Sequence, residues 1–333
     1  MAGAVPVVDI SPFVSGRAAG RASVVDAVRR ACEDTGFLTI VGHGVAPQAV
    51  ERVRRDLAVS FASPLEEKMA IERPAQEISR GYNPMATQAV ASTLGMATPP
   101  DLQESFGFGY CDVPRDPYFH TEMGRIFFAP NLWPQAPAGL KDTIVAYRRA
   151  MNELAGRVMR IFALALDLDE TFFDDKIDRA ISVLRIIHYP VPQRPPLAGQ
   201  WRAGPHTDYG TLTLLHIEDH PRALQIEDRT GAWIDIPATP GGYVVNIGDL
   251  MMRWTNDRWI STKHRVACPA PAVGERARMS VAFFHQPNYD AVCETIPTCV
   301  AAGESPRYAP VTSGEYWLSK TMKARGPAAE GDR

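Results

Sequence analysis

From Ile181 onward the chain is a series of short apolar, β-branched runs separated by turns, and this pattern limits the fold more than any other feature. The expected strands cover residues 182–189, 212–217, 223–227, 232–236, 243–247, 264–268 and 278–285. Repeated short strands with turn signals are typical of a β-sandwich or barrel. We therefore expect a mainly β protein with flanking helices, in which a double-stranded β-helix (jelly-roll) core follows an α-rich N-terminal region.

The N-terminal part of the chain has a different, helical periodicity. Apolar residues recur at helical spacing over 23–34 and 47–61, and a longer stripe over 140–166 predicts a helix that supports the sheet from outside. Residues 74–135 show little periodicity and are rich in Pro, Gly and Met, so we expect loops that lie over an active site. We divide the chain into an N-terminal region with these loops (1–135), a core of the long helix plus the jelly roll (136–325), and a tail (326–333).

Bulk composition limits the partners. The 333 residues, 45% of them hydrophobic, suit one large domain or two closely joined ones. With 35 basic and 38 acidic residues and no basic block, we expect no nucleic-acid partner. The odd number of cysteines, without a Cys-x-x-Cys pair, indicates reduced thiols. We find no signal peptide and no apolar run long enough to span a bilayer, and expect a cytoplasmic monomer with no membrane partner.

One motif introduces metal-binding chemistry. His206 and Asp208 are two residues apart, so in an extended strand both face one side while Thr207 faces away. His264 lies far enough downstream for several antiparallel strands to return it beside this pair. Two imidazoles and one carboxylate can occupy one face of an octahedral Fe(II) and leave other positions open, as in non-haem iron oxygenases. A lone His-x-Asp is more often a solvated turn, so this interpretation depends on the motifs that follow.

A candidate carboxylate-binding pair comes next in the chain. Arg278 and Ser280 lie on one side of the last expected strand. A guanidinium fork beside a hydroxyl is well suited to hold a carboxylate. Taken alone, Arg278 is compatible with an ordinary surface arginine such as Arg276, but its place after a His-Asp-His set favours carboxylate binding.

In this order the motifs resemble those of the 2-oxoglutarate and Fe(II)-dependent dioxygenases of the isopenicillin N synthase-like family. The resemblance covers nearly the whole chain, including residues 5–10, 35–45, 245–249 and 254–257. It implies a jelly-roll enzyme that uses Fe(II), 2-oxoglutarate and O2, with ascorbate as a supporting reductant. Such an enzyme oxidises a small-molecule substrate, by hydroxylation as the default, and releases succinate and CO2.

The resemblance also implies roles for single residues. His206, Asp208 and His264 would bind the iron. Arg278 and Ser280 would hold the distal carboxylate of 2-oxoglutarate, and Tyr189 matches a tyrosine that adds a hydrogen bond to that carboxylate. Many plant members carry an asparagine two positions before this tyrosine, where this chain has Ile187, so any contact of that asparagine is lost.

Within the family, the chain resembles thymine-dioxygenase-like members. In those enzymes the residues that match Arg185, Tyr209 and Phe284 contact a flat nucleobase, which implies substrate-binding roles for these three. Ser79 stands where those enzymes have an asparagine, and this difference counts against thymine itself. The shared blocks are 184–190, 206–210 and 278–280.

Two alternatives to this activity stay open at the level of sequence. One is an Fe(II) oxidase with the same metal site but no need for 2-oxoglutarate, and the other is a non-catalytic small-molecule-binding protein on the same barrel. Asp249 follows Gly248 at an expected turn, where it stabilises the turn or orders the loop that bears His264. The prime substrate, the choice between hydroxylation, desaturation and cyclisation, and the roles of residues 74–135 are left to the structure.

Overall fold

The strands of this computed structural model, which describes residues 5–218, 224–268 and 276–325, form three sheets. The largest has the order β1-β2-β10-β7-β12-β5-β4-β3, the second β6-β11-β8-β9, and the third pairs β13 with β14. Every pairing is antiparallel except that of β1 with β2. The strands are β1 Val7–Asp9, β2 Phe37–Val41, β3 Gly81–Asn83, β4 Glu104–Phe108, β5 Val183–Tyr189, β6 Ala203–His206, β7 Leu212–Ile217, β8 Leu224–Glu227, β9 Trp233–Ile236, β10 Tyr243–Ile247, β11 His264–Val266, β12 Arg278–His285, β13 Val292–Cys293 and β14 Val311–Thr312.

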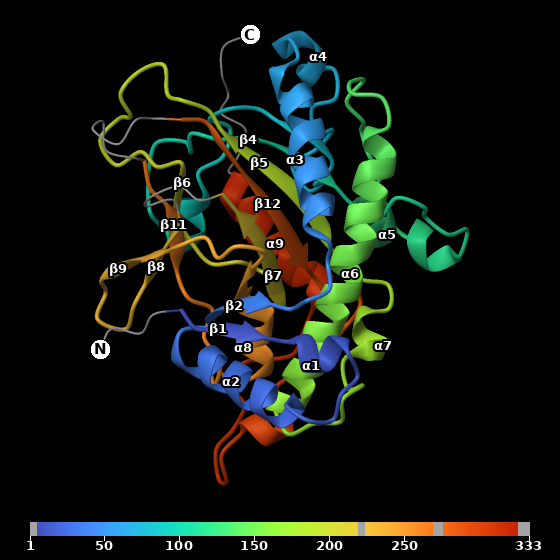
Figure 1. Cartoon of the computed structure of the whole chain (residues 1–333), viewed down its shortest axis with the longest axis vertical. Helices are drawn as coiled ribbons and strands as arrows, with labels where there is room; N and C mark the ends of the chain where they lie inside the picture. Colours follow the sequence, from blue (N-terminus) through green and yellow to red (C-terminus); the bar gives the residue numbers. More distant parts are fainter. Residues whose placement is uncertain (1–4, 219–223, 269–275, 326–333) are drawn as a thin grey trace.

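The jelly roll is formed by the second sheet and the middle of the first. Strands β10, β7, β12 and β5 lie opposite β6, β11, β8 and β9 (Figure 1), and a cavity between them is lined by residues of both sheets. This arrangement confirms the predicted fold class. The expected strands agree closely with β5 and with β7 to β12, because their apolar runs are bounded by turn residues.

Helices cover the outer face of the large sheet (Figure 1). The predicted long helix is α6, and its buried stripe includes Ile144, Met151 and Val158. The predicted helix 23–34 begins two residues earlier than expected, because Gly20 in the left-handed region precedes its first residue. The helices are α1 Ser11–Val14, α2 Arg21–Asp34, α3 Pro47–Ala62, α4 Leu65–Met69, α5 Glu122–Phe127, α6 Leu140–Ala165, α7 Asp174–Ile177, α8 Asp249–Trp254 and α9 Ser313–Arg325, with 3-10 turns η1 Val90–Leu94, η2 Pro117–His120 and η4 Pro297–Cys299.

Residues 74–135, expected to form loops, also contain two strands and a short helix. Strands β3 and β4 extend the large sheet beyond β5, with Phe106 paired to Ile186 and Tyr82 paired to Phe106. Every residue of both strands is buried, so neither shows the alternation of exposed and buried positions that reveals a half-buried strand.

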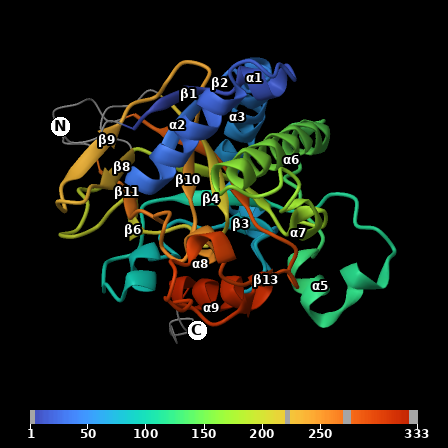
Figure 2. The same ribbon diagram turned by 90° about the horizontal axis from the view of Figure 1, so that it is seen from below.

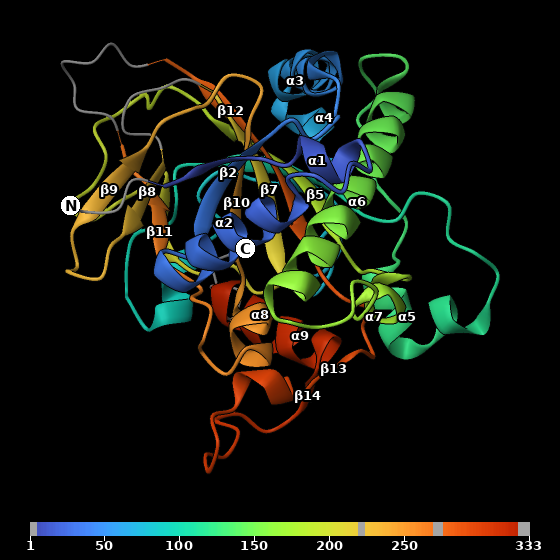
Figure 3. The ribbon, with the colours of Figure 1, turned by 60° about the horizontal axis from the view of Figure 1, so that its bottom comes forward.

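Helices α8 and α9 lie side by side at one end of the sheets (Figures 2 and 3). The expected tail 326–333 falls outside the described residues, and α9 ends at its boundary. All five cysteines are free thiols. Within the described ranges, no helix combines the length and apolarity needed to cross a bilayer.

Candidate active site

The three candidate metal ligands converge at one end of the jelly roll. His206 is the last residue of β6 and His264 is the first of β11, and the two are register partners. One ligand atom from each of His206, Asp208 and His264 lies within 4.8 Å of the others. Asp208 lies two residues beyond the end of β6, so the expectation that one extended strand carries both ligands holds only for His206.

Hydrogen bonds orient both imidazoles toward the point of convergence. Nδ1 of His206 is 2.7 Å from the Gly204 carbonyl oxygen, and Nδ1 of His264 is 3.2 Å from that of Thr262. A proton on each Nδ1 leaves Nε2 with a free lone pair, which is the form that binds a metal. Burial and the nearby His264 lower the pKa of His206 to about 4, so its ring is neutral at neutral pH.

Hydrogen bonds also fix the orientation of the Asp208 carboxylate. Its Oδ2 accepts hydrogen bonds from the Thr213 hydroxyl and from Asn246 Nδ2, the latter at 2.7 Å, while Oδ1 lies 3.8 Å from Nε2 of His264. Burial raises the pKa of Asp208, but the neighbouring imidazoles and these two donors outweigh it and hold the pKa below its ordinary value. An ionised carboxylate beside two imidazole rings fits a divalent transition metal.

Asn246 and Thr213 donate hydrogen bonds to Asp208, a role that the sequence did not predict for either residue. Residues 245–249 contributed to the family resemblance, but no role was assigned to the asparagine itself. Its signal was a polar side chain in the middle of an apolar strand, where burial without a hydrogen bond would be costly.

The predicted cosubstrate residues line a cavity of about 70 Å³ between the two sheets, together with the three metal-ligand candidates. Arg278 and Tyr189 are register partners on β12 and β5, and the Arg278 Cζ lies 4.3 Å from the centre of the Tyr189 ring. Arg278 Nη1 donates to Ser280 Oγ at 3.2 Å.

Two of the three guanidinium nitrogens of Arg278 make no hydrogen bond to the described residues. Its Nε and Nη2 are buried and have no hydrogen bond within the described part of the chain. Burial lowers the pKa of Arg278 to about 10, which still leaves it charged at neutral pH. A buried charge with unused donors is costly unless an anion pairs with it, so these atoms fit the distal carboxylate of 2-oxoglutarate.

A second cavity, of about 120 Å³, contains the predicted substrate residues Arg185, Tyr209 and Phe284. It adjoins the first, because Arg185, Phe284 and two of the metal-ligand candidates line both. Burial lowers the pKa of Arg185 to about 10, so this cavity also holds a cation.

Much of the second cavity's wall comes from the region 74–135, which was expected to lie over the site, and from α9, to which no role was assigned. Arg185 Nε donates to Ser105 Oγ at 2.8 Å and its Nη2 to Gln88 Oε1 at 2.6 Å, and both partners belong to the region expected to be loops. Trp317 and Thr321 of α9 complete the wall. No motif marks these residues, because their roles arise only from how distant segments pack.

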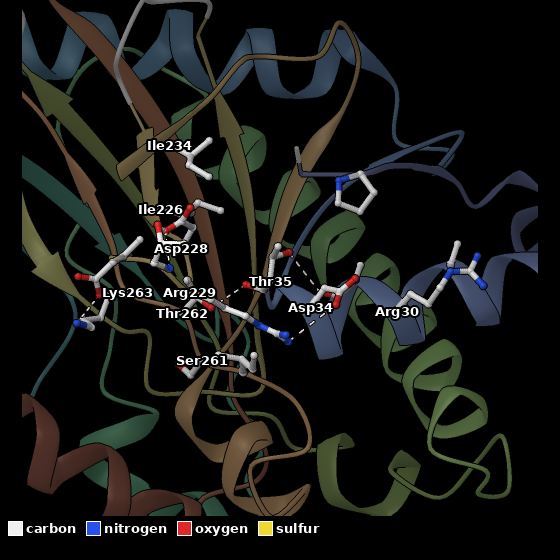
Figure 4. Close-up of a pocket in the computed structure, with 16 residues that line it drawn as sticks. Arg30, Asp34, Thr35, Ile226, Asp228, Arg229, Ile234, Ser261, Thr262 and Lys263 are labelled. Carbon is white, nitrogen blue, oxygen red and sulfur yellow. Dashed lines mark hydrogen bonds and ion pairs between the residues drawn. The ribbon is translucent and has the colours of Figure 1, made fainter. Parts of the chain in front are cut away.

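A larger hollow lies elsewhere, between α2 and the β8–β9 hairpin (Figure 4). Its volume is about 710 Å³, but none of the predicted site residues lines it. Two of its basic side chains are paired with protein groups: Arg229 Nη2 donates to the Glu33 carbonyl at 2.7 Å, and Lys263 pairs with Glu227. Volume alone therefore does not locate the chemistry of this protein.

A jelly roll that presents two imidazoles and a carboxylate beside a buried arginine, two of whose nitrogens have no hydrogen bond among the described residues, fits the non-haem Fe(II) and 2-oxoglutarate class of oxygenase. Comparison with known proteins agrees. Residues 5–136 match the model described as "non-haem dioxygenase in morphine synthesis N-terminal", and residues 180–287 match that of the 2OG-Fe(II) oxygenase superfamily.

Individual relatives cover most of the chain. The 2-oxoglutarate-Fe(II) type oxidoreductase hxnY of Emericella nidulans is 38% identical over 92% of this chain and 86% of its own. Validamycin A dioxygenase of Streptomyces hygroscopicus is 31% identical over 97% and 87%. The crystal structure of the full-length thymine-7-hydroxylase of Neurospora crassa, in complex with α-ketoglutarate and thymine, is 30% identical, covers 96% of each chain and has a TM-score of 0.82.

The chain belongs to the 2OG-Fe(II) oxygenase superfamily. It is an Fe(II)- and 2-oxoglutarate-dependent enzyme that oxidises a small-molecule substrate. The 2-oxoglutarate-independent oxidase and the non-catalytic binding protein are disfavoured accordingly.

Proposed function

We propose that this enzyme hydroxylates a small, planar, polar molecule at an Fe(II) ion bound by His206, Asp208 and His264. The observation that supports this assignment is the convergence of the three donors within 4.8 Å. A single ion can be shared by groups at such distances after small side-chain adjustments, and the set matches the ligands that Fe(II) takes in oxygenases.

The remaining assignments concern the cosubstrate. Arg278 and Ser280 bind the distal carboxylate of 2-oxoglutarate, and Tyr189 lines the same end of the cavity. The two free guanidinium nitrogens of Arg278 support this role, because a carboxylate satisfies both at once. The cavity walls, which come from both sheets, fix the orientation of the cosubstrate. When bound, Fe(II) with 2-oxoglutarate and O2 supplies the oxidising chemistry.

The lining of the second cavity indicates the substrate class. Arg185 offers a cation, the side chains of Asn83 and Gln286 offer amides, and Tyr209 and Phe284 offer aromatic surfaces. Among the described residues that line this cavity, Asp208 is the only carboxylate. A cationic substrate, such as the homoarginine named for some plant relatives, therefore finds no free counter-charge, whereas a planar heterocycle with carbonyl groups fits.

The proposal extends to the organisation of the chain. Residues 136–325 form the catalytic core, and residues 1–135 supply one wall of the substrate cavity, as the contacts of Gln88 and Ser105 with Arg185 support. We also propose a cytoplasmic monomer that binds neither nucleic acid nor membranes. Ascorbate supports its turnover by keeping the iron reduced.

Succinate formation by the purified enzyme with Fe(II), 2-oxoglutarate and ascorbate tests the function. Thymine, uracil and other planar cyclic amides are compared with homoarginine as added substrates. We expect at least one planar amide to raise succinate formation and to yield a hydroxylated product, and homoarginine to have no effect. Stimulation by homoarginine alone would refute the proposed substrate class, and the absence of succinate with every substrate would count against the enzyme assignment.

A further inference from the structure

Asp249 joins three parts of the molecule that are distant in sequence. It is the first residue of α8 and is only 3% exposed. Its backbone N–H donates to the Asp208 carbonyl oxygen at 2.7 Å, and its Oδ1 accepts from Ser261 Oγ at 2.7 Å. Its Oδ2 accepts from Lys320 Nζ at 2.8 Å and from the Tyr316 hydroxyl at 3.1 Å. Asp249 thus contacts a metal-ligand candidate, the segment that leads to another, and the C-terminal helix.

A close backbone approach makes this position possible. The junction of β10 and α8 packs directly on the loop that follows Asp208, and Gly248 donates its N–H to the Thr211 carbonyl at 3.0 Å. A Cβ atom on Gly248 would collide with the backbone of Gly210. Only glycine therefore lets Asp249 reach Asp208 without moving the loop.

Two neighbouring faces of α9 have different partners. Tyr316 and Lys320, four residues apart, meet Asp249. Trp317 and Thr321, each one residue further on, line the substrate cavity. The helix is also tied to the opposite wall, because Ser92 Oγ of η1 donates to the Lys323 carbonyl at 3.1 Å.

The contact between α9 and Asp249 is well placed to be strong. The Asp249 side chain is 4% exposed and that of Lys320 is 23% exposed, so the pair is largely shielded from solvent. Charge-assisted hydrogen bonds in such surroundings are stronger than those of surface ion pairs, and removal of one partner leaves the other charge buried and unpaired.

We infer that Asp249 is a positioning residue. Through Lys320 and Tyr316 it holds the C-terminal helix, which forms part of the substrate wall, in a fixed position relative to the loops that carry the proposed metal ligands. Only the part of the inference that concerns the metal ligands rests on the proposed function. The seating of α9 is independent of which ion or substrate the site takes.

Hydrogen exchange of residues 313–325, read by mass spectrometry on the full-length protein, tests the first half. Lys320→Met removes the charge but keeps an extended side chain, and Lys323→Met removes a charge from an exposed position of the same helix. We expect amide exchange in α9 to be about tenfold faster in Lys320→Met, since the loss of a hydrogen bond to a charged group is of this size, and unchanged in Lys323→Met. Equal exchange in the two variants would overturn the inference.

Mn(II) affinity, measured by electron paramagnetic resonance on the same proteins, tests the coupling. Asp249→Asn should weaken Mn(II) binding about tenfold, the lower end of the range for partners of metal ligands, and should speed α9 exchange as Lys320→Met does. The double variant should exchange no faster than either single one. Unchanged Mn(II) affinity in Asp249→Asn would refute the coupling.

Two further outcomes keep the test decisive. If Asp249→Asn does not fold, Tyr316→Phe replaces it, with faster α9 exchange expected and unaltered exchange contradicting the inference. If the wild-type protein binds no Mn(II), the proposed metal site and the coupling both fail, whereas α9 exchange as slow in Lys320→Met as in the wild type overturns the seating of α9 alone.

Discussion

At the cosubstrate end of the site, Arg278, Ser280 and Tyr189 stand on two paired strands of the jelly roll, whereas the substrate end is walled largely by β3, η1, loops and α9. The register of antiparallel strands fixes the first group, since side chains two residues apart must share a face. At the substrate end, Arg185 and Phe284 also stand on β5 and β12, but the rest of the wall is placed by packing between segments far apart in the chain. The proposed cosubstrate residues therefore rest on the sheets alone, whereas much of the substrate wall rests on segments outside the jelly roll, which can vary more readily.

Loss of a metal ligand should have the largest effect. We expect Asp208→Ala to lower succinate formation by more than about a hundredfold, since even the loss of an outer hydrogen-bonding partner of a ligand can cost that much. His120→Ala, which changes an exposed histidine, should leave the rate unchanged. Coupled turnover near the wild-type rate in Asp208→Ala would remove Asp208 from the metal site.

Replacement of Arg278 should affect the cosubstrate end alone. Arg278→Ala should raise the KM for 2-oxoglutarate on the order of a hundredfold, because a buried carboxylate loses its charged partner. Arg276→Ala, at an exposed position two residues earlier, is the matched control. Steady-state kinetics with 2-oxoglutarate as the varied reactant measures the effect, and an unchanged KM would assign the carboxylate to another residue.

Asn246 contacts the Asp208 carboxylate through Oδ2, whereas Oδ1 faces the imidazole of His264. Asn246→Ala removes one of the two donors to Asp208 Oδ2 and should weaken Mn(II) binding by about tenfold to a hundredfold. Asn246→Asp should weaken it further, because it places a second carboxylate against the first. If both variants bind Mn(II) as tightly as the wild type, this hydrogen bond does not tune the site.

Replacement of Arg185 tests whether the two ends are separate. Arg185→Met should raise the KM for the prime substrate by about tenfold and leave the 2-oxoglutarate KM unchanged, because its guanidinium is held by Ser105 and Gln88 on the substrate side. Arg278→Ala should show the reverse pattern. A parallel rise of both constants in either variant would mean that the two cavities act as one.

The smallest expected effect is a change in the free energy of unfolding when Glu104 on β4 is replaced. Burial raises the pKa of Glu104, but hydrogen bonds from His188, Lys68 and Tyr82 outweigh it and lower the pKa to about 2. Because this lies below the unfolded value of about 4.3, the stabilisation is complete above that pH and is lost as the pH falls toward 2. In urea unfolding at a series of pH values, Glu104→Gln should be less stable at pH 7 and should lose less stability on acidification. An equally steep acid loss would contradict this.

The sequence predicted the jelly roll and the long helix because each has a local signal, namely short bounded strands or a helical stripe. The site residues that it proposed had a local signal too, often a spacing of two. It failed where the signal is not local. Strand β4 is buried on both faces and looked like a loop, and Gln88 and Trp317 reach the cavity only because distant segments pack together. The sequence also showed no sign of the contacts between Asp249 and α9. It did indicate that Asp249 lies near the loop that bears His264.

Anaerobic titration of the protein with Fe(II) in the presence of 2-oxoglutarate, followed by the absorption band of their complex, tests the central claim most directly. If His206, Asp208 and His264 share one ion, the wild type binds one Fe(II) per chain and develops the band, while His264→Ala does not. A band of the same intensity and stoichiometry in His264→Ala would show that the iron is bound elsewhere.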